Sequence, residues 1–312
     1  MALFLCHKNE LTKAPNMYYT DQSIVFLDGR WLPAKDANVS LYSQTMHYGS
    51  GVFEGIRSYR TADSFNIFKA KDHFDRLIYS AQKMHMEVPY TTQELTNIAY
   101  ELLDKNDLTD AYIRPLVFAG ENMGLSPAAD FHVFMTCWKW EKYLGSKPLN
   151  VMVSSYRRPD PRSCHVEAKV VGHYSNSLLA TTEAKKLGYD EALLLDADGY
   201  VAEAPGANFF FEKDGMLYTP PAGNILPGIT RSTVKELAYE LGIPVIEKKF
   251  EVEEVYKADS AFFVGTAVEV AGIESINGEK LPLIWEDSIG HQIYLMYRQK
   301  VMYNEYQGLT IV

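Results

Sequence analysis

The order of strand-like and helix-like segments constrains the fold of this chain more than any other feature of its sequence. The stretches 71–86 and 92–105 repeat apolar residues at helical spacing. The stretches 111–119 and 131–138 are apolar and partly β-branched, as strands are. After residue 151, short strand-like runs follow one another between Asp-Gly turns. Strict β-α-β alternation is absent, so the pattern predicts an α+β fold and not a doubly wound parallel sheet.

Local signals set the expected limits of these elements. Asp28-Gly29 lies between two apolar runs and predicts a hairpin over 23–33. Thr92 is expected to cap the helix at 92–105, and Gly188 to end a helix at 174–187. The other expected elements are strands at 151–156, 191–196, 200–202, 207–212, 216–219 and 260–264, and helices at 230–241 and 286–305.

The length of the chain predicts two domains, because 312 residues exceed the size of one ordinary core. The segment 144–149 is rich in turn residues and has little hydrophobic pattern. We therefore expect an N-terminal domain over residues 1–145, a linker at 146–150 and a C-terminal domain over 151–312.

Composition excludes several classes of function. A net charge of −10 without any cluster of Lys and Arg argues against a nucleic-acid partner. The three cysteines (Cys6, Cys137 and Cys164) form no CxxC pair and have no nearby His at metal-ligand spacing, so free thiols and no metal site are expected. No apolar run has membrane-spanning length, and the first residues do not resemble a leader. The expectation is a soluble cytoplasmic protein.

Lys169 is the first candidate catalytic residue. It stands in the apolar segment 167–174. A single lysine in such a place usually extends its ammonium group into water, and in isolation that is the better interpretation of Lys169. Removal from water, however, makes a lysine amine a usable nucleophile and base. Tyr174 adds a hydroxyl group five residues later. The interpretation therefore depends on which other groups accompany Lys169.

Two downstream segments supply such groups. Glu203 lies between two expected strands, next to the irregular Pro205-Gly206. A carboxylate there could hold a proton on the ring nitrogen of pyridoxal phosphate (PLP), although an exposed acid is the simpler interpretation. In 226–231, Gly228 precedes the expected helix, so the amides of Ile229 and Thr230 could bind a phosphate. An ordinary threonine cap after a Pro-Gly turn would look the same.

Three more segments contain residues suited to anion or ligand binding. Gly265-Thr266-Ala267 follows an expected strand and could form a nest of amides, or simply a turn. Tyr112 and Arg114 share one face of a strand by the period of two, as a carboxylate site would need. The segment 47–59 combines three glycines with two tyrosines and an arginine, which indicates a tight loop beside a strand.

Taken together, these segments resemble those of the branched-chain amino acid aminotransferases, which are fold-type IV PLP enzymes. The resemblance runs from about Ile24 to the end of the chain. It implies a two-domain α+β fold, similar to D-amino acid aminotransferase, with PLP at the domain interface. Its specific pieces, in their family order, are His47–Tyr59, Asp75-Arg76-Leu77, Tyr112–Pro115, Lys169–Tyr174, Glu203–Asn208, Leu226–Arg231 and Gly265–Glu269.

The resemblance implies a role for each matching cofactor residue. Lys169 would bind PLP as a Schiff base and move the proton in catalysis. Glu203 would pair with the pyridine nitrogen, and Tyr174 with the phenolic oxygen. The residues implied to bind the cofactor are Lys169, Arg76, Tyr174, Glu203, Leu226, Gly228, Ile229, Thr230 and Thr266.

The resemblance also implies a substrate site and a homodimer. Tyr112 and the Thr266-Ala267 backbone would bind the substrate α-carboxylate, and Arg114 the distal carboxylate of glutamate. Tyr48 would reach the site from the partner subunit, so a homodimer or a higher assembly is expected. The residues implied to bind substrate are Phe53, Tyr48, Tyr112, Arg114, Trp140, Tyr143, Thr266 and Ala267.

The implied reaction is transamination of leucine, isoleucine and valine with 2-oxoglutarate in a ping-pong cycle. His173 stands where an Asn is usual in the family, Val170-Val171 where small residues are usual, and Pro205 and Ala207 also depart from the common pattern. Two alternatives stay open at this point. One is another enzyme of the same fold, a D-amino acid aminotransferase or an aminodeoxychorismate lyase. The other is a phosphate-binding protein without such chemistry.

Overall fold

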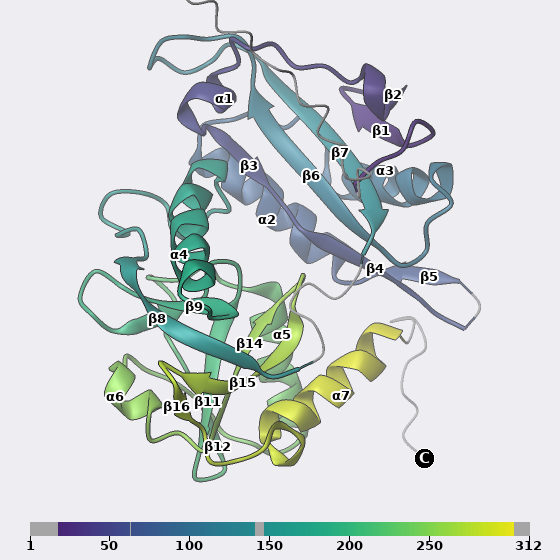
Figure 1. Cartoon of the computed structure of the whole chain (residues 1–312). Helices are drawn as coiled ribbons and strands as arrows, with labels where there is room; N and C mark the ends of the chain where they lie inside the picture. The colour runs from purple at the N-terminus through teal and green to yellow at the C-terminus, as the bar shows by residue number, and fades with distance from the viewer. Residues whose placement is uncertain (1–17, 63, 141–146, 303–312) are drawn as a thin grey trace, which may run out of the picture.

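The computed structural model describes residues 18–62, 64–140 and 147–302, which form two β-sheets with helices packed on them (Figure 1). The first sheet has the order β2-β1-β7-β6-β4-β5, with β3 also paired to β6, and its pairings are antiparallel. Its strands are β1 (Ile24–Leu27), β2 (Arg30–Pro33), β3 (Gly51–Phe53), β4 (Ile56–Arg60), β5 (Phe65–Ile67), β6 (Ala111–Ala119) and β7 (Phe131–Lys139).

The predicted hairpin over 23–33 is confirmed. Asp28 and Gly29 form its two-residue turn between β1 and β2, and both have positive φ angles of 48° and 78°. Two such residues give the turn a twist that matches the right-handed twist of paired strands. The Asp28 carboxylate also accepts a hydrogen bond from the backbone of Val133 at 2.8 Å, which ties the turn to β7.

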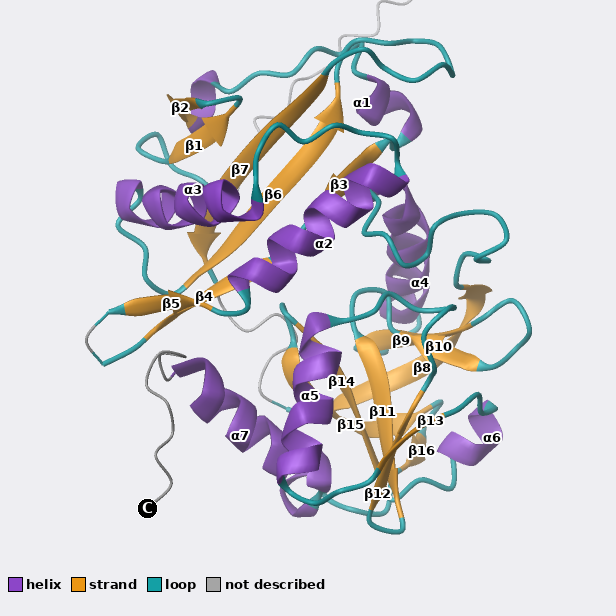
Figure 2. Ribbon diagram, turned by 180° about the vertical axis from the view of Figure 1, so that it is seen from behind, coloured by secondary structure: helices purple, strands orange, loops and turns teal. Residues whose placement is uncertain are grey.

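Helices α2 (Ala70–Lys83) and α3 (Thr92–Lys105) cover one face of the first sheet (Figure 2). Their apolar faces meet the sheet in one core, where Phe74, Leu77, Leu95 and Leu102 are fully buried. The helical periodicity therefore predicted both elements correctly. The predicted cap was wrong by one residue, because the Thr91 side chain, and not that of Thr92, accepts the backbone N–H of Glu94.

The second sheet has the order β10-β9-β8-β15-β14-β11-β12-β13, with β16 paired to β15. It is mixed, since β8 runs parallel to both β9 and β15 and β12 runs parallel to β13. Its strands are β8 (Leu149–Arg157), β9 (Glu191–Leu195), β10 (Val201–Glu203), β11 (Asn208–Lys213), β12 (Met216–Thr219), β13 (Val245–Glu247), β14 (Ser260–Gly265), β15 (Glu269–Ile276) and β16 (Glu279–Lys280).

The two faces of this sheet have separate cores. Phe210 and Phe262 stack with ring centroids 5.3 Å apart and pack with α5 (Ile229–Glu240) and α7 (Ile289–Met302). Phe209, Phe211 and Phe263 face the other way, as alternation along a strand requires. The remaining helices are α1 (Gln44–Tyr48), α4 (Tyr174–Lys186), which packs on β8 and β9, and α6 (Val252–Val255).

Several differences from the sequence-based expectations concern the second sheet, where the short strands β13 and β16 were among those not predicted. Strand β15 was not predicted, although it pairs with both β14 and β8. Strand β8 begins at Leu149, inside the expected linker and two residues before the expected strand. The division of the chain at 146–150 stays a prediction, and part of that segment lies outside the described residues.

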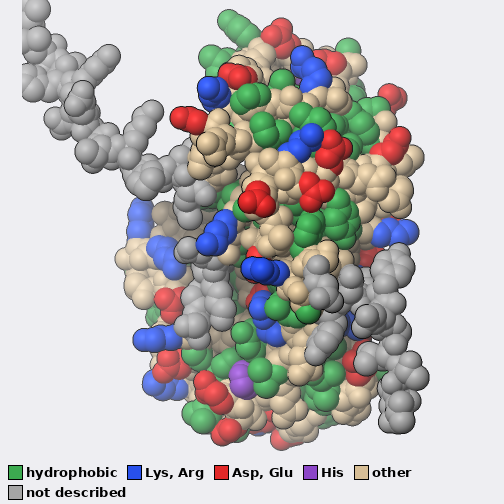
Figure 3. Space-filling view, turned by 90° about the vertical axis from the view of Figure 1, so that its right-hand side faces the viewer, with side chains coloured by type: hydrophobic (Ala, Val, Ile, Leu, Met, Phe, Trp, Pro, Cys, Tyr) green, Lys and Arg blue, Asp and Glu red, His purple; other side chains and the backbone are tan. Residues whose placement is uncertain are grey.

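The surface in Figure 3 mixes acidic and basic side chains over the visible face. In the part of the chain that the structure describes, no helix is long and apolar enough to cross a membrane. Over the same residues, no group of three or more His, Cys, Asp or Glu side chains is arranged to hold a metal ion.

Candidate active site

A pocket of about 700 Å³, partly open to solvent, lies between the two sheets. Eleven of the residues singled out from the sequence line it: Arg76, Tyr112, Lys169, Tyr174, Glu203, Leu226, Gly228, Ile229, Thr230, Thr266 and Ala267. These eleven residues are up to 191 positions apart in the chain, from Arg76 to Ala267.

Lys169 is held by the first sheet, although it follows β8 in the sequence. Its carbonyl accepts the N–H of Phe53 in β3 at 3.1 Å, and its own N–H donates to the Ser80 hydroxyl of α2 at 3.0 Å. Val170 forms a bridge with Val52, and both are buried in the core of the first sheet. Val170 therefore anchors the segment of Lys169 to the first sheet.

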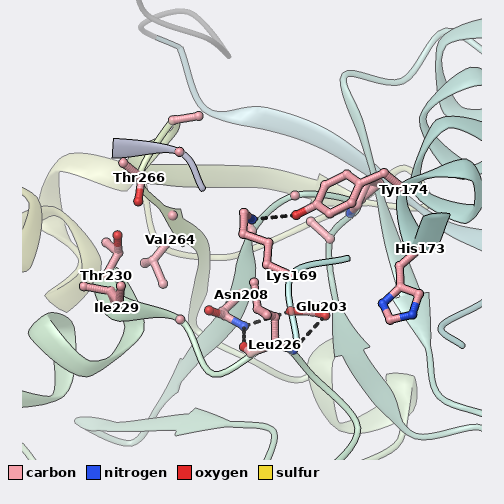
Figure 4. A pocket seen from close by; sticks show the side chains of 18 of the residues that line it. Lys169, His173, Tyr174, Glu203, Asn208, Leu226, Ile229, Thr230, Val264 and Thr266 are labelled. Atoms are coloured by element: carbon pink, nitrogen blue, oxygen red, sulfur yellow. Dashed lines mark hydrogen bonds between the residues drawn. The ribbon is translucent and has the colours of Figure 1, made fainter. Parts of the chain in front are cut away.

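The amine of Lys169 points into the pocket (Figure 4). Its Nζ donates a hydrogen bond to the Tyr174 hydroxyl at 2.6 Å and lies 4.9 Å from the centre of the Phe53 ring. The Phe53 and Tyr174 rings meet edge to face at 4.8 Å. Two aromatic walls therefore restrict where the amine can move.

Glu203 is buried at the end of β10, where several donors surround its carboxylate. Oε1 pairs with the Arg158 guanidinium at 2.8 Å and accepts the N–H of Leu226 at 3.1 Å. Oε2 accepts the side-chain amide of Asn208 at 2.9 Å. Burial raises the pKa of Glu203, and the positive charge of Arg158 opposes this rise. A cation placed beside Glu203 would therefore be stabilised strongly.

Sequence reasoning did not single out Arg158 or Asn208 as site residues. Arg158 lies just after β8, and a lone arginine at that place has no distinctive sequence signal. Asn208 begins β11, directly opposite Glu203 in the strand pairing. That register could have been inferred from the short loop between the two strands. His173 lines the pocket as well, and burial, followed by the charge of Arg158, lowers its pKa.

The N-terminus of α5 forms the far wall of the pocket. Gly228 is its N-cap, and the segment 226–231 enters the helix as the sequence predicted. The first amides of a helix have no partner within the helix, so those of Ile229 and Thr230 are suited to an anion. Gly228 has no room for a side chain, because a Cβ there would overlap the Asn208 side chain. The backbone can therefore approach a ligand closely.

Tyr112 and Arg114 lie on one face of β6, as their spacing predicted. Arg114 donates from Nη2 to the Tyr112 hydroxyl at 3.3 Å, and its guanidinium lies 4.7 Å from the centre of the Phe53 ring. Trp140 stacks on Tyr112 at 4.5 Å. Among the residues that the structure describes, Arg114 forms no ion pair.

Of the predicted substrate residues, Tyr112, Thr266 and Ala267 line the pocket, whereas Phe53, Arg114 and Trp140 lie beside Tyr112 or Lys169 without lining it. Two others lie elsewhere. Tyr48 is half exposed and donates to the Met123 carbonyl at 2.8 Å, on the surface of the first domain. Tyr143 lies outside the described residues. Their proposed roles, like those of the residues that line the pocket, stay predictions.

The residues of the pocket fit PLP on each of its walls. A phosphate matches the α5 amides, a pyridine nitrogen matches the buried Glu203, and a phenolic oxygen matches Tyr174. The Lys169 amine lies 2.6 Å from that hydroxyl, next to where a ring aldehyde would be held.

Comparisons with known proteins agree with this chemistry. The family model for amino-transferase class IV matches residues 51–276. The branched-chain-amino-acid aminotransferase of Pseudomonas aeruginosa is 42% identical over 264 residues, which are 83% of this chain and 86% of that protein.

Solved structures of similar enzymes have the same fold. The branched-chain aminotransferase of Thermoproteus uzoniensis, with norvaline, has a TM-score of 0.87 at 39% identity and covers 91% of this chain and 96% of its own. The branched-chain amino acid aminotransferase of Thermobaculum terrenum, in its PLP form, has a TM-score of 0.85 at 34% identity and covers 90% and 94%.

Proposed function

This chain belongs to the class IV aminotransferase family, and we propose that it transaminates leucine, isoleucine and valine with 2-oxoglutarate, using PLP. It is a PLP-dependent enzyme of fold type IV with a two-domain α+β architecture. The observation that supports the substrate proposal best is Arg114, a cation in an aromatic wall that forms no ion pair within the described ranges. Apolar side chains and a distal carboxylate can both be accommodated by such a wall.

The chain's own residues perform distinct tasks in this reaction. When bound, PLP supplies an electron sink that makes the substrate α-proton acidic and stores the amino group. The Lys169 amine, fixed between two rings, moves that proton as base and then acid. Glu203 holds a proton at the ring nitrogen, because a buried carboxylate is stabilised by a cation there.

Binding and orientation come from the other walls. The amides that begin α5 and the Arg76 guanidinium bind the phosphate. Tyr112 and the Thr266-Ala267 backbone orient the substrate α-carboxylate beside Lys169. The aromatic residues exclude water from an aliphatic side chain, which favours leucine, isoleucine and valine over polar amino acids.

The proposed substrate range is tested by steady-state rates with a panel of L-amino acids and 2-oxoglutarate. Leucine, isoleucine and valine should give the highest kcat/KM, and D-alanine and aminodeoxychorismate should give no turnover. Activity with either of the last two would favour the other enzymes of this fold. Borohydride treatment should fix the cofactor to a peptide that contains Lys169. Purified protein without bound PLP would instead support a phosphate-binding protein.

Arg114→Gln separates the two substrates of the proposed cycle. The variant should lose the reaction with glutamate and 2-oxoglutarate about 100-fold or more, since a buried carboxylate would lose its charged partner. Its half-reaction with leucine, followed by the change in cofactor absorbance, should change by less than about threefold. Equal losses in both half-reactions would contradict the assigned role of Arg114.

We also infer that the enzyme is a homodimer in which Tyr48 completes the partner's pocket. Tyr48 is turned away from its own pocket and lies beside exposed apolar side chains on the surface of the first domain. These side chains include Leu41, Tyr42, Met46 and Leu125, and such a patch is characteristic of an interface. Sedimentation should give twice the chain mass, and Leu125→Glu should yield inactive monomers. The cytoplasmic location stays a prediction from the sequence.

A further inference from the structure

We propose that Glu54, a fully buried residue outside the assigned chemistry, is the positioning residue that orients Arg76 toward the cofactor phosphate. This inference rests on the proposed PLP-dependent function. Glu54 lies between β3 and β4, and its side chain has no exposed surface. A buried carboxylate is costly unless it is paired and fully hydrogen-bonded, so its partners indicate its purpose.

Arg76 is the main partner of Glu54. Its Nε donates to Oε1 at 2.6 Å, and its Nη2 donates to Oε2 at 3.0 Å. These two parallel bonds fix the plane of the guanidinium, as a bidentate pair does. Arg76 belongs to α2, whereas Glu54 lies in the short connection between β3 and β4 of the first sheet. The pair therefore sets the direction in which the arginine leaves its helix.

Two further donors complete the Glu54 carboxylate. His73, one turn before Arg76, lies with Nδ1 at 2.8 Å from Oε2, and the N–H of Gly55 donates to the same oxygen at 3.2 Å. Burial alone would raise the pKa of Glu54, but the charge of Arg76 and the His73 hydrogen bond hold it well below its usual range. Glu54 is therefore ionised, and His73 is the donor in their hydrogen bond.

The remaining donors of Arg76 face the pocket. A guanidinium has five N–H groups, of which Nε and one on Nη2 are bound to Glu54. One on Nη1 donates to the Pro227 carbonyl at 3.0 Å, directly before the N-cap Gly228 of α5. One N–H on each of Nη1 and Nη2 is left, and Arg76 lines the pocket beside the α5 amides. Glu54 thus holds the Arg76 guanidinium, with two donors left, at the wall of the pocket that also contains Ile229 and Thr230.

The same carboxylate is connected to the substrate side of the pocket through Gly55. Gly55 lines the pocket and has no room for a side chain, because a Cβ there would overlap the Tyr112 hydroxyl. Its N–H is bound to Glu54, so the path of the chain past Tyr112 depends on the same buried group. Glu54 therefore contacts both Arg76, at the proposed phosphate site, and Gly55, beside Tyr112 at the proposed substrate site.

The test compares how tightly the enzyme binds PLP and pyridoxal, which lacks the phosphate. Apoenzyme prepared from the purified protein is titrated with each compound, without amino acid substrate. Glu54→Gln should raise the Kd of PLP about 10- to 100-fold, because the residue that orients a ligand-binding side chain is lost. The Kd of pyridoxal should change by less than about twofold. The matched control is Glu191→Gln, a buried carboxylate in β9 outside the pocket, which should change neither.

A double-mutant cycle tests whether Glu54 acts through Arg76. Glu54→Gln should have no further effect on PLP affinity in an Arg76→Gln background. If Glu54→Gln does not fold, His73→Gln is used instead, because it removes another hydrogen bond to the Glu54 carboxylate. It should raise the Kd of PLP but not that of pyridoxal. Equal losses for both compounds, or additive effects in the cycle, would overturn the proposal. A wild-type protein that does not bind PLP would instead refute the proposed function itself.

Discussion

The ion pair of Arg158 and Glu203 is buried in the part of the pocket that we assign to the pyridine nitrogen. Both side chains are at most 8% exposed, and their shortest distance is 2.8 Å. Removal of one partner leaves the other charge buried without compensation, which is far more costly than removal of both. The pair therefore allows a sharp test of how the ring-nitrogen site is built.

Arg158→Met should lower the free energy of unfolding by about 3–5 kcal/mol at pH 7, because the buried Glu203 would lose the cation that opposes the effect of burial on its pKa. Chemical denaturation of the apoenzyme measures the change. Arg162→Met is the control, because Arg162 is 80% exposed and its surface pair with Asp160 should contribute little to stability. The double variant Arg158→Met with Glu203→Gln should recover most of the loss. If Arg158→Met lowers the free energy of unfolding no more than Arg162→Met does, the pair of Arg158 and Glu203 does not behave as a buried ion pair.

The residues of the pocket differ in how visible they were in the sequence. Lys169, Glu203 and Gly228 stand in segments whose residue types and spacing indicate a cofactor site, and the structure places all three at the pocket. Arg158 and Glu54 were not found, because a buried ion pair joins positions that are distant in sequence and has no local pattern. Only the fold brings such partners together.

At the scale of elements, periodicity predicted the helices well, but their ends depend on individual side-chain bonds. Helix α3 was expected to have Thr92 as its cap, yet the capping box is formed by Thr91 and Glu94. Both threonines fit the pattern of a cap, and Thr92 instead donates to Asp75 of α2 at 2.6 Å. The contact with a neighbouring helix decides between them, and sequence alone does not contain it.

Thr91→Ala should therefore destabilise the protein by about 1 kcal/mol, since an N-cap side chain and its reciprocal bond are lost. Thermal or urea unfolding measures this. Thr96→Ala, in the middle of the same helix, removes only a bond to the Thr92 carbonyl and should change stability by less than about 0.5 kcal/mol. If Thr96→Ala costs as much as Thr91→Ala, the capping role is wrong.

Strand β9 begins with a buried carboxylate, Glu191, whose pKa is raised by burial. A raised pKa means that the charged form is disfavoured in the folded state. The free energy of unfolding is therefore not reduced by Glu191 below pH 4.5, the ordinary pKa of a glutamate. It falls as the pH rises through the pKa of Glu191 in the folded protein. Gln can accept the bonds that Glu191 accepts from Thr181 and from the Ala192 N–H.

Glu191→Gln should accordingly be more stable than the wild type at pH 7 to 8 and equal to it near pH 4. Unfolding curves at several pH values measure the difference. The pH profile distinguishes this effect from a change in packing, which would be the same at all pH values. A difference that grows as the pH falls would contradict the raised pKa.

Strand β15 shows why some elements were not predicted. It is paired on both sides and largely buried, so it lacks the alternation of polar and apolar residues that identifies a strand with one exposed face. It also contains Gly272, whose missing side chain leaves room for the Trp285 ring. A glycine inside a short mixed run lowers any strand prediction, although packing explains it here.

At the scale of the whole molecule, the segment around Lys169 joins the two sheets. Val170 is buried in the first core, and the N–H of Gly172 donates to the Gly49 carbonyl at the end of α1 at 3.1 Å. A Cβ on Gly49 would lie 2.7 Å from the Gly172 Cα, so the two backbones touch. The glycine-rich motifs were recognised in the sequence as functional loops, but not as parts of one contact between domains.

Gly49→Ala should disturb both the stability and the chemistry of the enzyme through this contact. Gly49 has a φ of 69°, so alanine there has a conformational cost of about 1–2 kcal/mol, and it would also push the Gly172 backbone away. Displacement of that backbone moves Lys169, three residues earlier, so kcat/KM should fall by about 100-fold.

Gly188→Ala is the matched control, because Gly188 also ends a helix with φ 84° but has no atom within 4 Å of the added Cβ. It should show the conformational cost in unfolding experiments and leave kcat/KM unchanged. If the two variants lose stability and activity equally, the contact between Gly49 and Gly172 does not position Lys169.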